Sequence, residues 1–189
     1  MPLHQHISRR QFITTAGQAT LASAALVHAG HRSSAANIIG ANDRIRLAVC
    51  GVRKRGFDHV RLFSEIPNVS VAAICDVDES VIADRLAKME QLGLPKPETF
   101  TDVRKLLEDP SIDAITIATP NHWHTLMAIW ALQAGKDVYV EKPFSHNWWE
   151  GRQLIRAIKR YNRIVQHGAQ TRSSESANEA IRHLQAGLI

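Results

Sequence analysis

The chain has 189 residues, of which 44% are hydrophobic and 22% are charged, and its formal net charge is +5. This composition is typical of a globular domain and argues against a wholly disordered chain. After residue 36, lysine and arginine do not form a stripe with interleaved aromatic residues, so nucleic-acid binding is not expected.

The N-terminal segment has the pattern of an export signal. Ser8–Ile13 reads SRRQFI and precedes an uncharged, weakly apolar run that ends near Ala29, with small residues for cleavage near 27–29 or 34–36. This pattern resembles a twin-arginine signal, which implies the twin-arginine translocation machinery as a partner and a periplasmic or otherwise exported protein. The alternative is an amphipathic helix or an uncleaved anchor. Because no acidic residue precedes Asp43, we expect residues 1–36 to be a signal peptide and linker, whose removal leaves a net charge of about +2.

From Ile45 onward, short apolar runs alternate with helical patterns, which predicts an α/β fold with a doubly wound parallel sheet. Strands are expected at 45–51 and 69–76, and helices at about 55–66 and 80–92. The segment 92–100, LGLPKPETF, is expected to be a turn.

The second half of the chain continues this alternation. Asp102 is suited to cap a short helix, Gly135 to end one in the left-handed conformation, and Asn147 with Glu150 to form a capping box. The expected helices are 102–107, 122–133, one from Asn147 to about Tyr161, and 175–185; the expected strands are 113–119, 137–140 and 163–168.

The two cysteines, Cys50 and Cys75, lie near the ends of the first two expected strands. Export and neighbouring strands would allow a disulfide between them. The twin-arginine route carries proteins that have folded in the reducing cytosol, so we expect free, buried thiols.

The first strand leads into a glycine loop, CGVRKRGF, that matches part of a dinucleotide-binding fingerprint. Gly51 and Gly56 occupy the first and third glycine positions of G-x-G-x-x-G, and Arg53 occupies the second. A glycine at the second position lets the backbone approach a pyrophosphate, so Arg53 puts that geometry in doubt. The basic loop at a helix N-terminus still suits an anion, and Val52 and Arg55 complete the predicted cofactor-binding set in this loop.

Asp76 ends the second expected strand, 20 residues after Gly56. This spacing fits a carboxylate that accepts hydrogen bonds from the adenosine ribose, which favours NAD. The basic glycine loop favours NADP, which stays open as the alternative. Asp76 as a plain turn residue is the competing interpretation.

Three segments together resemble the Gfo/Idh/MocA oxidoreductases, the family of glucose-fructose oxidoreductase and inositol dehydrogenase. They are the glycine loop, ATPNHWH at 118–124 and AGKDVYVEKP at 134–143. The resemblance implies a Rossmann dinucleotide-binding domain at 43–168 and the start of a truncated C-terminal substrate domain at 169–189. It also implies that the usual catalytic histidine and the oligomer interface lie in the rest of that second domain, so an oligomer is expected only if the full domain is present.

The EKP segment places Lys142 just past the carboxyl end of a strand, where ligands bind in open parallel sheets. We expect Lys142 to be catalytic, by hydrogen bonding the reacting oxygen and sharing proton transfer. Glu141 and Pro143 are expected beside the cofactor, and the resemblance implies a cis peptide before Pro143. A surface ion pair between Lys142 and Glu141 is the competing interpretation.

Thr119, Pro120 and Asn121 follow another strand and are expected to line the nicotinamide side of the cleft, with His124 beside them. An H-x-H pair also occurs in metal sites, but suitably spaced further ligands are missing. We therefore expect helix-capping or packing histidines and no metal.

These features predict the nucleotide-binding part of an exported NAD(P)-dependent oxidoreductase that acts by hydride transfer on a sugar, cyclitol or related polyol. Two alternatives stay open. One is a non-catalytic NAD-binding remnant, and the other is a glycoside-processing enzyme that holds and recycles its NAD.

Overall fold

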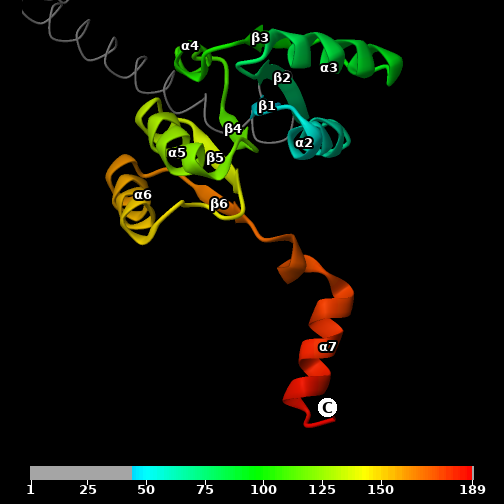
Figure 1. The fold of residues 1–189 in the computed structure, drawn as a ribbon, viewed down its shortest axis with the longest axis vertical. Coiled ribbons are helices and arrows are strands. Elements are labelled where there is room, and N and C mark those ends of the chain that lie inside the picture. The colour runs from blue at the N-terminus through cyan, green and yellow to red at the C-terminus, as the bar shows by residue number, and fades with distance from the viewer. Residues whose placement is uncertain (1–43, 189) are drawn as a thin grey trace, which may run out of the picture. The chain divides into compact units, whose positions relative to one another are not determined.

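The computed structural model describes residues 44–188 (Figure 1), so the predicted signal segment lies outside the described residues. Six parallel strands form one sheet in the order β3-β2-β1-β4-β5-β6, which confirms the doubly wound α/β fold. The sequence order reverses between β1 and β4, where such sheets open to ligands. The strands are β1 Ile45–Cys50, β2 Val69–Cys75, β3 Glu98–Phe100, β4 Ala114–Ile117, β5 Asp137–Glu141 and β6 Val165–Gly168.

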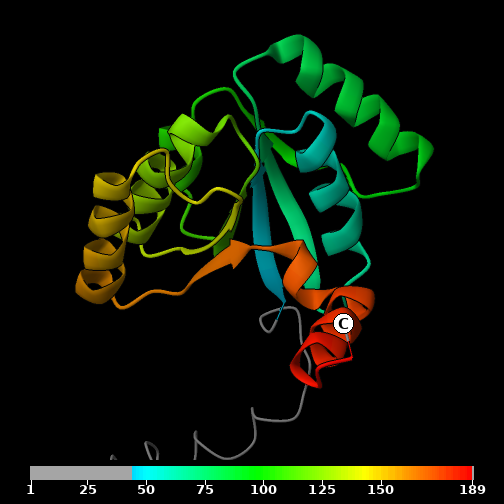
Figure 2. The same cartoon turned by 60° about the horizontal axis from the view of Figure 1, so that its bottom comes forward.

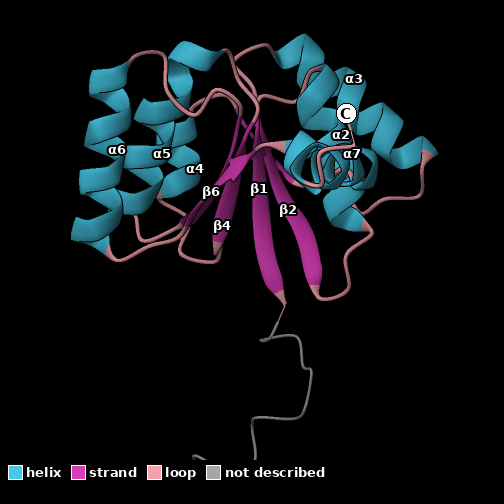
Figure 3. Ribbon diagram, turned by 90° about the horizontal axis from the view of Figure 1, so that it is seen from below, coloured by secondary structure: helices cyan, strands magenta, loops and turns pink. Residues whose placement is uncertain are grey.

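Helices cover both faces of this sheet (Figure 3). One apolar cluster joins β1 and β2 to the helices α2 and α3, and a second joins β1, β2, β4 and β5 to α4, α5 and α6. Burial on both faces explains the nearly continuous apolar sequence of the central strands. The helices are α2 Lys54–Ser64, α3 Glu79–Gln91, α4 Val103–Leu107, α5 His124–Gln133, α6 Trp148–Tyr161 and α7 Glu175–Gln185, with short 3-10 helices at η2 Asn121–Trp123 and η3 Gln170–Ser173.

The predicted helix ends are confirmed by their hydrogen bonds. The Asp102 carboxylate accepts from the Arg104 amide at 2.9 Å at the start of α4. At α6 the Asn147 side chain accepts from the Glu150 amide at 3.0 Å, and the Glu150 carboxylate accepts from the His146 amide at 3.1 Å, one residue before the cap. Gly135 has a φ of +76° after α5, as expected for a helix terminator.

The expected turn at 92–100 is corrected by the structure, because its last three residues form the edge strand β3. Its register places Glu98 beside Ala73 and Phe100 beside Cys75 on β2. A three-residue strand is too short to show a periodicity, and its backbone pairs come from a distant segment. The expected helix 122–133 also begins differently, with η2 preceding α5.

Cys50 and Cys75 are register partners on β1 and β2, and both are buried free cysteines, as predicted. The pKa of Cys50 is raised well above its usual value by its interaction with the Cys75 thiol and by burial. A thiol with so high a pKa is a poor nucleophile at neutral pH.

The chain leaves the sheet after β6 through η3 and α7 (Figure 2). No residue of α7 is buried, and Ile181 and Leu184 on it are about half exposed. The assignment of 169–189 to a second domain stays a prediction. No helix within residues 44–188 combines the length and hydropathy needed to cross a bilayer.

Candidate functional site

The loop between β1 and α2 requires glycine at two positions. Gly51 has a φ of +78°, and a Cβ there would lie 2.9 Å from the backbone of Ala118 at the end of β4. A Cβ on Gly56 would lie 1.6 Å from the Gly51 carbonyl oxygen. The first glycine therefore permits the tight turn, and the third lets α2 pack against it. This is the cradle that a dinucleotide-binding loop needs.

Arg53 fills the second glycine position without distorting this cradle. It is the N-cap residue of α2 with a φ of −66°, and no side chain of the described residues caps that helix. Its guanidinium forms an ion pair with Asp78 at the start of α3, with Nη2 and Oδ2 2.7 Å apart. The side chain is thus directed toward α3, and the uncapped start of α2 retains the positive end of the helix dipole.

Asp76 lies at the carboxyl end of β2 and faces the same loop. Its Oδ2 accepts from the Val52 amide at 3.0 Å, and its Oδ1 accepts from the Asp78 amide at 3.2 Å. A carboxylate has further lone pairs that can accept from ribose hydroxyls. The residue thus stabilises the glycine loop as well as presenting a carboxylate beside it.

A cavity of about 580 Å³ opens beside Gly51 and Asp76, at the carboxyl ends of β1 and β2. Pro120 lines this cavity, and its expected place on the nicotinamide side of the cleft stays a prediction. Pro120 follows β4 and is the N-cap residue of η2. Its extended backbone, with a φ of −55° and a ψ of 142°, leads into the tight turn of that helix. The lining residues include Gly51, Asp76, Val77, Thr101, Arg104, Pro120 and Trp123.

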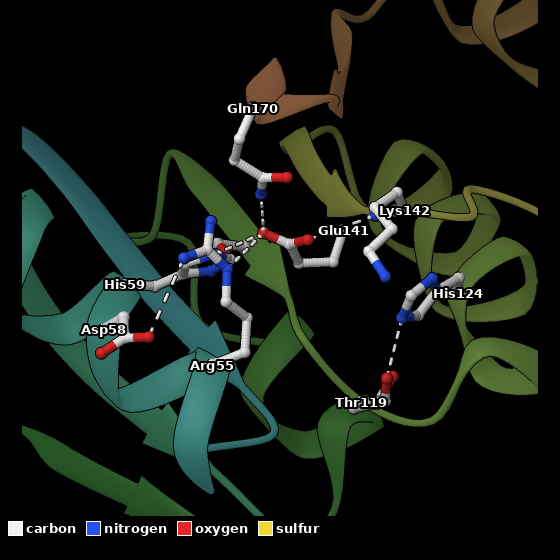
Figure 4. Close-up of polar contacts among 9 residues, drawn as sticks. Arg55, Asp58, His59, Thr119, His124, Glu141, Lys142 and Gln170 are labelled. Atoms are coloured by element: carbon white, nitrogen blue, oxygen red, sulfur yellow. Dashed lines mark hydrogen bonds and ion pairs between the residues drawn. The ribbon is translucent and has the colours of Figure 1, made fainter. Parts of the chain in front are cut away.

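A second cavity, of about 540 Å³, lies beside Arg55 and the segment that follows β4, and Lys142 lines it. The exposed Lys142 follows β5, and its side chain reaches toward His124, whereas the Glu141 side chain turns toward α2 (Figure 4). The predicted Thr119 and Asn121 are brought together here. The full lining is Arg55, Ala118, Thr119, Asn121, His124, Glu141, Lys142 and Gln170.

Glu141 is the centre of a buried polar network. Its Oε1 accepts from Arg55 Nε at 2.7 Å, from His59 Nε2 at 3.0 Å and from Gln170 Nε2 at 2.6 Å. Burial alone would raise the pKa of Glu141, but the hydrogen bonds from Arg55, Gln170 and His59 outweigh it and lower the pKa to about 2. Glu141 is therefore ionised and paired with Arg55, so the competing ion pair with Lys142 is not formed.

His59 completes this network from α2. Burial lowers its pKa, although the Glu141 hydrogen bond acts in the opposite direction. A carboxylate only accepts, so Nε2 of the neutral ring donates to Glu141 and Nδ1 accepts from the Thr116 hydroxyl. His59 and Gln170 were not predicted from the sequence, because a histidine within a helix is a weak signal for a site and Gln170 carries no local signal.

His124 packs the cleft wall and links two strand ends. It is 2% exposed, with Nδ1 2.6 Å from the Pro143 carbonyl oxygen and Nε2 2.8 Å from the Thr119 carbonyl oxygen. The neighbouring Thr125 hydroxyl donates to the Phe144 carbonyl at 3.0 Å. The start of α5 thus fixes the chain directly after Lys142, which agrees with the packing interpretation of His124.

Two further observations concern the predicted site residues. The peptide bond between Lys142 and Pro143 is cis, as the resemblance implied. Within residues 44–188, no group of three or more histidine, cysteine, aspartate or glutamate side chains is arranged to hold a metal ion.

Comparison with known proteins places this architecture among characterised folds. A family model described as an oxidoreductase family with an NAD-binding Rossmann fold, Gfo/Idh/MocA, matches residues 45–169. A curated relative from Shewanella sp. (strain W3-18-1), named a glycosyl hydrolase family 109 protein, is 33% identical over 172 residues, covering 82% of this chain and 38% of the relative. The chain therefore spans less than half the length of that relative.

Solved structures give the same fold. The myo-inositol 2-dehydrogenase of Lactobacillus plantarum is 29% identical with a TM-score of 0.68, covering 77% of this chain and 42% of that protein. The scyllo-inositol dehydrogenase of Lactobacillus casei, solved with NAD(H) and scyllo-inositol, has a TM-score of 0.67 over 77% of this chain and 42% of that protein. At 24% identity the second likeness concerns the fold alone.

Proposed function

The chain belongs to the Gfo/Idh/MocA family of oxidoreductases with an NAD-binding Rossmann fold, and from this premise we propose that its described domain binds NAD for hydride transfer to or from a sugar, cyclitol or related polyol. The glycine loop and the start of α2 would hold the pyrophosphate, and Asp76 the adenosine ribose. Bound NAD would supply the hydride acceptor or donor.

The observation that carries this proposal is a pair of cavities at the carboxyl edge of the sheet, one lined by Gly51 and the other by Arg55 of the same glycine-loop segment. The cavity beside Asp76 suits the adenosine half, and the cavity beside Lys142 suits the reacting half. The strands that supply Gly51, Asp76 and Lys142 all end at the same edge of the sheet.

Within the second cavity, Lys142 is the group that we assign to catalysis. The Glu141 carboxylate pairs with Arg55 rather than with Lys142. The Lys142 ammonium can therefore donate a hydrogen bond to a substrate oxygen. Such a donor stabilises a developing alkoxide and can carry the hydroxyl proton as hydride moves. His124 would act indirectly, because both of its ring nitrogens face backbone carbonyls.

A second candidate function is glycoside processing with tightly held, recycled NAD. The name of the Shewanella relative favours it, and an exported enzyme would lack a soluble cofactor pool. This candidate differs from an ordinary dehydrogenase in one measurable property, because its NAD would survive gel filtration.

Both candidates are tested by purifying the chain, denaturing it and identifying any released nucleotide by mass spectrometry, with calorimetric NAD titration of the native protein. Stoichiometric released NAD supports the recycled-cofactor enzyme. Exchangeable binding without released nucleotide supports the ordinary dehydrogenase. Folded protein that neither carries nor binds NAD would contradict both and leave the non-catalytic remnant.

We also propose export by the twin-arginine machinery, on the strength of Arg9 and Arg10 in SRRQFI. Conversion of both arginines to lysine preserves the charge and should leave the protein in the cytoplasmic fraction. Equal periplasmic amounts of the wild type and this variant would contradict the proposal.

A further inference from the structure

The Arg53 side chain is held by a carboxylate that the sequence pattern did not identify. Arg53 Nη2 lies 2.7 Å from Asp78 Oδ2, and both side chains are partly exposed, at 67% and 37%. Asp78 lies two residues after Asp76, and its amide donates to the Asp76 carboxylate. The two acidic residues and the arginine therefore surround the rim where the proposed function places the adenosine ribose.

Asp78 is fixed in this position independently of Arg53. It is the N-cap residue of α3, and its Oδ1 accepts from the Ser80 amide at 3.0 Å and from the Ser80 hydroxyl at 2.6 Å. The Ser80 hydrogen bonds lower the pKa of Asp78, despite some opposing desolvation, and Arg53 adds to the effect. The Asp78 carboxylate is thus held in place, because its Oδ1 caps α3 through Ser80 and its Oδ2 pairs with Arg53.

A second guanidinium, that of Arg104, lines the cavity beside Asp76 and is also paired with a carboxylate. Arg104 Nη2 lies 2.6 Å from Asp102 Oδ2, and Arg104 lines the cavity. A 2′-phosphate at the ribose would therefore meet Asp76 and Asp78, and would have to displace a carboxylate to reach either arginine. Arginine is a strong phosphate ligand only when its donors are available.

We propose that Asp78 is a specificity-determining residue, which sequesters Arg53 from the 2′-phosphate of NADP and so favours NAD. The assignment rests on the proposed function, in which Asp76 and the glycine loop hold a dinucleotide. In the sequence, Asp76 favours NAD and the basic glycine loop favours NADP. The assignment resolves this conflict, because Arg53 of that loop is paired with Asp78 at the N-cap of α3.

The test is calorimetric titration of the full chain with NAD and, separately, with NADP at one fixed low ionic strength. Asp78→Asn removes the charge and keeps a good N-cap. We expect it to lower the Kd for NADP by about five- to twentyfold, through a partly exposed arginine–phosphate contact, and to leave the Kd for NAD within about twofold. Asp78→Ser, a second good cap, is the substitute if Asn impairs folding.

Two controls separate this effect from a general change in charge. Asp84→Asn removes a carboxylate that pairs with Lys88 at 2.9 Å on the same helix, and should leave NADP affinity unchanged. Adding Arg53→Gln to Asp78→Asn should abolish the gain. If the wild type binds NAD but Asp78→Asn gains no NADP affinity, or if the gain survives Arg53→Gln, the specificity assignment is wrong. A folded wild type that binds neither nucleotide overturns the proposed function and the assignment with it.

Discussion

Replacement of Glu141 by glutamine is expected to cost the protein substantial stability at neutral pH. The carboxylate is buried, and its pKa is lowered from 4.5 to about 2 by hydrogen bonds from Arg55, Gln170 and His59, which outweigh the opposing effect of burial. This lowering of the pKa corresponds to about 3 kcal/mol of preference for the ionised form in the folded state. The Arg55 side chain is 40% exposed, so solvent screening reduces the expected loss to about 2 kcal/mol.

The pH dependence distinguishes this electrostatic effect from a packing defect. Because the folded-state pKa lies below the unfolded value, the stabilisation by Glu141 is fully present above about pH 4.5 and is lost as pH falls toward 2. Urea unfolding of wild type and Glu141→Gln across pH 7 to 3 should therefore show a difference that narrows in acid. Asp84→Asn, at an exposed ion pair, is the control and should cost far less stability than Glu141→Gln. A difference between wild type and Glu141→Gln that is negligible at pH 7, or independent of pH, would refute the network as described.

Other consequences follow from single positions. Gly51→Ala should lower the unfolding free energy by about 1–3 kcal/mol and weaken NAD binding, because Gly51 has a positive φ and lies close to the Ala118 backbone. Gly93→Ala is the control: Gly93 also has a positive φ but has open space around it, so the loss of unfolding free energy should come from the backbone conformation alone. Equal losses of unfolding free energy in the two variants would contradict the close-packing argument. In a form of the protein that turns over a polyol, Lys142→Ala should reduce kcat by about 10²–10⁴-fold with NAD affinity unchanged, and unaltered turnover would remove Lys142 from catalysis. Cys50 and Cys75 should react with a thiol reagent only after unfolding, and rapid labelling of the native protein would contradict their burial.

The local signals in the sequence were sufficient for most of the fold. The capping box at Asn147 and Glu150 and the terminator Gly135 act over one helical turn, so their residue types identified the helix ends. The positions of Gly51 and Asp76 relative to their strands likewise predicted one ligand-binding edge, because parallel strands bring their carboxyl ends together.

The partners of the site residues were decided only by the tertiary structure. Glu141 meets Arg55 and His59 across 86 and 82 residues of chain, so no spacing rule connects them. The edge strand β3 likewise exists through hydrogen bonds to β2, and a turn of the backbone places Pro120 in the cavity beside Asp76. Helix caps and hydrophobic periodicity depend on residues that are close in sequence, so they can be predicted from it. Ion pairs and cavity walls between distant segments form only when strands and helices pack together.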